Sequence, residues 1–71
     1  MPTHAHLTAI VVRGRLSSSL VAALDGYRIE ALPGGMTRVV GPVADQSMLF
    51  GLLGMFDGLN IEVVSVNQVD P

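Results

Sequence analysis

Hydrophobic positions along the chain switch between a strand-like and a helix-like spacing. Residues 6–16, HLTAIVVRGRL, are rich in β-branched residues and have no helical period, which predicts a strand. Its middle is apolar on both alternating faces, a pattern typical of a strand that is covered on both sides. Residues 17–27 place apolar residues on one helical face between a serine N-cap, Ser17, and a glycine stop, Gly26, and predict a short helix.

Two further strands flank the turn signal LPGG. A three-residue loop at residues 33–35 sets Ile29 opposite Val39 and Glu30 opposite Arg38. A two-residue loop would instead set Ile29 against Arg38. The first register matches apolar with apolar and pairs opposite charges, so we expect the three-residue loop.

A second helix is predicted for residues 45–58, with Asp45 as its N-cap, and a final strand for residues 61–69. The order strand, helix, strand, strand, helix, strand indicates an α+β protein. With right-handed crossovers, it most simply gives a four-stranded antiparallel sheet with two helices on one face, the ferredoxin-like arrangement. Residues 1–71 are therefore expected to form a single ferredoxin-like domain.

In this topology the first and third strands are central, and one face of the sheet stays open. We expect that face to carry charged residues towards one edge and apolar residues towards the other: Arg28, Glu30 and Arg38, then Ile10, Val12 and some of Val63, Val64 and Val66. A face of this mixed kind favours sheet-to-sheet or edge-to-edge association between copies.

Small and large residues occupy opposite sides of the second predicted helix. One narrow stripe holds only small residues: Ser47, Gly51, Gly54 and Gly58. A broad arc opposite holds the large apolar residues: Met48, Leu49, Leu52, Leu53, Met55, Phe56 and Leu59. The stripe is either a solvated back or a face that another helix approaches closely, and both interpretations stay open. Phe50 is the large apolar residue that lies outside the arc. We therefore predict an interface that includes Phe50 and the three glycines of this helix, together with Ile10 and Val12 of the expected open sheet face.

Composition adds to the expectation of self-association. A chain of 71 residues buries only about 60% of its extended-chain surface, so its own core is thin. Charged residues make up 14% of the chain and hydrophobic residues 49%, which leaves an under-charged surface for a monomer. We therefore expect a homo-oligomer, most simply a dimer, or a module that binds a protein partner.

Charge and length also exclude some partners. The net charge is -2, and no two basic residues are closer than Arg13 and Arg15, which argues against nucleic-acid binding. The uncharged run 46–56 is shorter than the roughly 20 residues of a membrane span. No signal peptide is predicted from the N-terminal sequence, and the absence of cysteine favours a cytoplasmic location.

No catalytic residue, cofactor or metal ligand is assigned. His4 and His6 could point the same way on a strand, but no Cys, Asp or Glu is nearby in the sequence, so solvated histidines are favoured. The segment VRGRLSS resembles the strand-to-helix junction of the 4-oxalocrotonate tautomerase family. That resemblance implies an enzyme with an amino-terminal proline base, Pro2, paired with Arg13 and Arg15. It is the less favoured alternative.

The loop RGRLSSS offers a further alternative. The predicted strand and helix order is similar to that of the ACT and RAM domains, which bind small effectors near the loop between the first strand and the first helix. By this similarity, Arg13, Gly14, Arg15 and Ser17 would bind an amino-acid-like carboxylate. Solvated arginines in a loop are the competing interpretation.

The segments GPVADQSMLFGLL and LNIEVVSV carry one more resemblance, over about residues 37–66. They resemble a group of small uncharacterised actinobacterial proteins with a G-x-V-x-D-Q-x-x-L-x-G-L-L motif. Such proteins often carry His where this chain has Phe50. The resemblance implies a small α+β domain and no particular activity.

Overall fold

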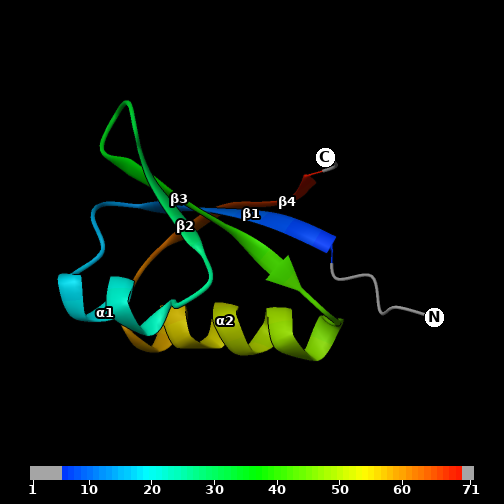
Figure 1. Ribbon diagram of the computed structural model, residues 1–71. Coiled ribbons are helices and arrows are strands. Elements are labelled where there is room, and N and C mark those ends of the chain that lie inside the picture. The colour runs from blue at the N-terminus through cyan, green and yellow to red at the C-terminus, as the bar shows by residue number, and fades with distance from the viewer. Residues whose placement is uncertain (1–5, 70–71) are drawn as a thin grey trace.

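The computed structural model describes residues 6–69, with only the backbone of His6 included (Figure 1). Its elements are β1 (His6–Arg13), α1 (Ser18–Ala23), β2 (Arg28–Leu32), β3 (Met36–Val43), α2 (Gln46–Gly58) and β4 (Val63–Val69). The four strands form one layer, and both helices lie beneath it on the same face of the sheet. The predicted ferredoxin-like α+β fold is confirmed. Neither helix of the described residues is long and apolar enough to cross a membrane.

The sheet has the strand order β2-β3-β1-β4, and every neighbouring pair is antiparallel. The strands β1 and β3 are central, as predicted. The hairpin register is also as predicted, with Ile29 opposite Val39 and Glu30 opposite Arg38. Glu30 Oε1 accepts a hydrogen bond from Arg38 Nε at 2.5 Å. This charged pair lies on the open face of the sheet, as predicted from the sequence.

The core forms between the sheet and the two helices. Its buried cluster consists of Ile10, Val12, Leu20, Leu24, Val39 and Phe56. Ile10 and Val12 are only 1% and 0% exposed, so their predicted placement on the open face is wrong. The pairing of Ile10 with Val39 puts both side chains on the helix side. By the alternation of the strand, the open face of β1 instead carries Leu7, Ala9, Val11 and Arg13.

Both helices begin at the predicted caps. Ser17 Oγ accepts a hydrogen bond from the backbone N–H of Leu20 at 3.2 Å, and Asp45 Oδ1 accepts one from the N–H of Met48 at 2.8 Å. The first helix is shorter than predicted, since it ends at Ala23. The turn that follows places Tyr27 beyond the helix, where its side chain packs against the core.

Candidate functional site

The outer edge of β4 is the least protected edge of the sheet. Within residues 6–69, β4 pairs only with β1, so the backbone groups along its other side have no strand partner. Its sequence, VVSVNQV, contains no charged residue, proline or glycine. Natural edge strands are usually shortened, charged or interrupted by proline, because an unprotected edge pairs with other chains. The opposite edge, β2, follows that rule, since it is only five residues long and carries Arg28 and Glu30.

A β-bulge divides β4 into two parts. Val11 pairs with Ser65 while Val12 pairs with Val63, so Val64 is the extra residue. From Ser65 to Val69 the pairing is regular. In this part Val66, opposite Ile10, lies on the helix side, while Ser65, opposite Val11, lies on the open face.

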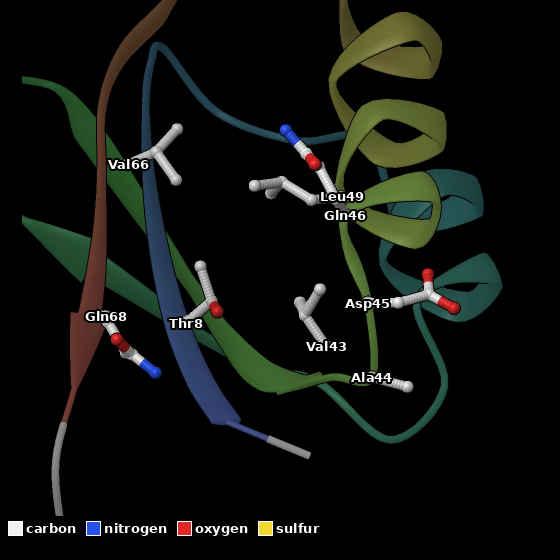
Figure 2. Close-up of a pocket in the computed structure, with 8 residues that line it drawn as sticks. All are labelled: Thr8, Val43, Ala44, Asp45, Gln46, Leu49, Val66 and Gln68. Atoms are coloured by element: carbon white, nitrogen blue, oxygen red, sulfur yellow. The ribbon is translucent and has the colours of Figure 1, made fainter. Parts of the chain in front are cut away.

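A hollow of about 290 Å³ lies on the helix side of this edge, between β4, β1 and the first turn of α2 (Figure 2). Its lining residues are Thr8, Val43, Ala44, Asp45, Gln46, Leu49, Val66 and Gln68. Figure 2 shows Val66 pointing from the sheet towards α2 and Leu49 pointing back towards the sheet. Val66 remains 36% exposed because α2 does not fully cover it. The floor of the hollow is therefore apolar. Its polar lining residues are Thr8, Gln46, Gln68 and the acidic Asp45, whose carboxylate points away from the hollow in Figure 2.

Phe50 lies beside this hollow. It follows Leu49 directly and stands one turn after Gln46, both of which line the hollow. Its side chain is 59% exposed, more than that of any other exposed large hydrophobic residue of the described chain. We call the set Val64–Gln68 with Phe50 the edge surface. The sequence pointed to Phe50, but it gave no reason to group Phe50 with β4.

The small-residue stripe of α2 faces open space within this chain. All four of its residues are exposed. A Cβ atom added at Gly51, Gly54 or Gly58 would meet no other atom within 4 Å. Nothing within residues 6–69 therefore requires glycine at these positions by close contact, and the predicted interface at this stripe remains a prediction.

The four predicted ligand-binding residues do not converge on one place. Arg13 Nε lies 3.1 Å from Glu62 Oε1, and the Ser17 hydroxyl caps α1. The backbone of Gly14 bridges to β3, because its carbonyl accepts a hydrogen bond from Thr37 Oγ1 at 2.6 Å. Arg15 alone borders a cavity.

That second cavity, of about 360 Å³, lies between α1 and β2. It is lined by Arg15, Leu16, Val21, Ile29, Ala31 and Thr37. Arg13 is on the open face of the sheet, whereas Arg15 borders a cavity on the helix side. The two guanidinium groups therefore cannot bind the same carboxylate. Pro2 and His4, which carry the tautomerase and metal hypotheses, lie outside the described residues.

Comparison with known families places the chain in one of them. The model of a family described as a domain of unknown function, DUF8691, matches residues 7–67. The chain belongs to this family. The DUF8691 match runs from β1 into β4, so it includes the loop of Arg15 and all of the edge surface except Gln68. No curated protein and no solved structure matches the chain.

Proposed function

We propose that this DUF8691 chain is a non-enzymatic assembly module that acts by associating with copies of itself, most simply as a homodimer in the cytoplasm. The observation that carries the proposal is the free, uncharged β4 edge, flanked by the exposed side chains of Val66 and Phe50. An unpaired edge of this kind is a template for another strand. The low share of charged residues, 14%, supports the same conclusion.

The core of this chain is small, so association with a second copy would add to the stability of the fold. The buried hydrophobic residues of the described chain are few: Ala9, Ile10, Val12, Leu20, Leu24, Val39, Val43 and Phe56. Small domains with so little buried apolar surface are usually reinforced by disulfides, metals or association. This chain has no cysteine, so disulfides are excluded and association is favoured.

The oligomeric state tests the proposal directly. Sedimentation equilibrium and light scattering on the full chain should show a dimer whose population rises with concentration. Both methods report mass independently of molecular shape. A single monomeric species up to the highest soluble concentration would contradict the proposal.

The cavity beside Arg15 favours a second candidate function, the binding of a small carboxylate. The cavity combines one exposed cation with apolar walls, which suits an amino acid with an apolar side chain. Thermal-shift measurements across amino acids and other small acids should reveal a ligand that raises the unfolding temperature. The rise should be lost in Arg15→Gln and kept in the control Arg13→Gln, because Arg13 pairs with Glu62 on the other face.

A further inference from the structure

We propose that the β4 edge pairs with β4 of a second copy, antiparallel and centred on Val66, so that the two four-stranded sheets become one continuous sheet. The proposal rests on the proposed self-association and names the surface that performs it. A strand is the expected occupant because the edge offers a row of backbone donors and acceptors, which only an extended chain satisfies in full. A second copy supplies an identical strand, and a two-fold axis makes the two strands antiparallel.

The sequence of β4 is self-complementary in this register. Val66 lies opposite Val66 of the second copy on the helix side of the sheet. Ser65 lies opposite the second copy's Asn67 on the open face, so two hydrogen-bonding side chains meet. A shift of two residues in one direction would set a glutamine against Val66. The same shift in the other direction would set Val66 against Val64, the bulge residue.

Phe50 strengthens the choice of this edge. Leu49 and Val66 line the same hollow, so they lie at a similar height along α2 and β4. Phe50 is the next residue after Leu49, only about 1.5 Å further along the helix axis. Phe50 therefore lies near the level of Val66, where the two-fold axis would pass. The two Phe50 side chains then approach each other beneath the paired Val66 residues, and both lose exposed apolar area.

The competing edge, β2, is less suitable. A pairing centred on Ile29 would set Arg28 opposite the Glu30 of another copy. However, Glu30 already accepts a hydrogen bond from Arg38 within its own hairpin. The strand is also two residues shorter than β4 and is followed at once by Pro33, which has no backbone N–H to donate.

Single-cysteine cross-linking tests the register, since the chain has no cysteine of its own. Oxidised Val66→Cys should give a disulfide-linked dimer, because directly opposed residues bring their Cβ atoms to about 4.5–5.5 Å, a short adjustment from disulfide geometry. Ser65→Cys is the matched control one residue away. The two copies of residue 65 lie diagonally across the pairing, so Ser65→Cys alone should give no disulfide-linked dimer. The double variant Ser65→Cys/Asn67→Cys should give one, because residue 65 of each chain lies opposite residue 67 of the other.

A second pair of variants tests the side-chain contact. Phe50→Glu should weaken dimerisation by about tenfold or more, because two carboxylates would meet at the axis. Leu59→Glu is the control, since Leu59 is 54% exposed but lies at the far end of α2 and on its other flank. It should leave the dimer unchanged. Circular dichroism should show that both variants remain folded.

The outcomes separate this inference from the proposed function. A monomeric wild type would contradict both. A dimer that links through Ile29→Cys but not through Val66→Cys would place the contact at β2. A dimer that Phe50→Glu leaves intact, with no link at Val66, would place it elsewhere. Either of the last two results would overturn the β4 pairing while leaving self-association standing.

Discussion

At the scale of single residues, the most constrained glycine is Gly41, where the ring of Tyr27 packs against β3 on the helix side of the sheet. A Cβ at Gly41 would lie 2.7 Å from Cε2 and 2.8 Å from Cγ of Tyr27, well inside van der Waals contact. The Tyr27 hydroxyl also donates a hydrogen bond to the carbonyl of Pro42 at 3.2 Å, which helps to hold the ring in place. The glycine of the G-x-V-x-D-Q segment thus has a packing role in this chain.

We expect Gly41→Ala to lower the free energy of unfolding by about 1–3 kcal/mol, because the added methyl group displaces the Tyr27 ring. Urea unfolding followed by circular dichroism measures the change. The same substitution in a Tyr27→Ala background should cost much less, since the ring is gone. Equal costs in both backgrounds would show that the close approach of Tyr27 is not the cause.

At the scale of elements, Asp45 determines where α2 begins. Its carboxylate accepts the N–H of Met48, one of the backbone donors that the first turn leaves unpaired. We expect Asp45→Ala to destabilise the protein by about 0.5–2 kcal/mol, and Asp45→Asn to retain most of the stability, because Asn also caps helices well. Asp57→Ala is the control near the other end of α2, where removing an acid should cost little. Thermal or urea unfolding of the three variants checks this.

The small-residue stripe of α2 leads to a prediction of the opposite sign. Because a Cβ at Gly51 or Gly54 would meet no other atom within 4 Å, alanine fits both positions. Each substitution should stabilise the chain by about 0.5–1 kcal/mol through helix propensity. Calorimetry on the double variant measures the gain. If dimerisation uses the β4 edge, the double variant should associate as the wild type does. Weaker association would identify the stripe as the contact.

The elements also show which parts of the fold the sequence could predict. The hairpin register was predictable because the pairing of Ile29 with Val39 and of Glu30 with Arg38 is local and depends on one loop length. The orientation of β1 was not. Both faces of β1 are apolar, and only its pairing with β3, distant in sequence, turns Ile10 towards the helices. The wrong placement of Ile10 and Val12 came from this missing long-range register.

At the scale of the whole molecule, the candidate site was predictable only in part. Phe50 stood out because it falls outside the apolar arc of its own helix. Its position next to the hollow that Val66 and Leu49 line depends on how α2 lies against β4, which no local pattern encodes. The absence of charge in VVSVNQV was a usable signal, since the strand was also expected beside β1 and therefore at an edge.

The proposed dimer makes stability depend on concentration. If folded dimer unfolds to two separate chains, each tenfold increase in concentration stabilises the folded state by about 0.7 kcal/mol per chain, half of the 1.4 kcal/mol that a factor of ten represents. For a chain of 71 residues, this should raise the unfolding temperature by about 3–6 °C per tenfold increase. Differential scanning calorimetry across two decades of concentration measures the shift.

Two variants decide whether that shift comes from the edge surface. Phe50→Glu should unfold at a lower temperature and lose much of the dependence on concentration, whereas Leu59→Glu should keep the wild-type dependence. Loss of the dependence in both variants would indicate a general effect of added negative charge on a chain whose net charge is already -2. Loss in Phe50→Glu alone would tie the stability of this thin-cored fold to the side of α2 that borders β4.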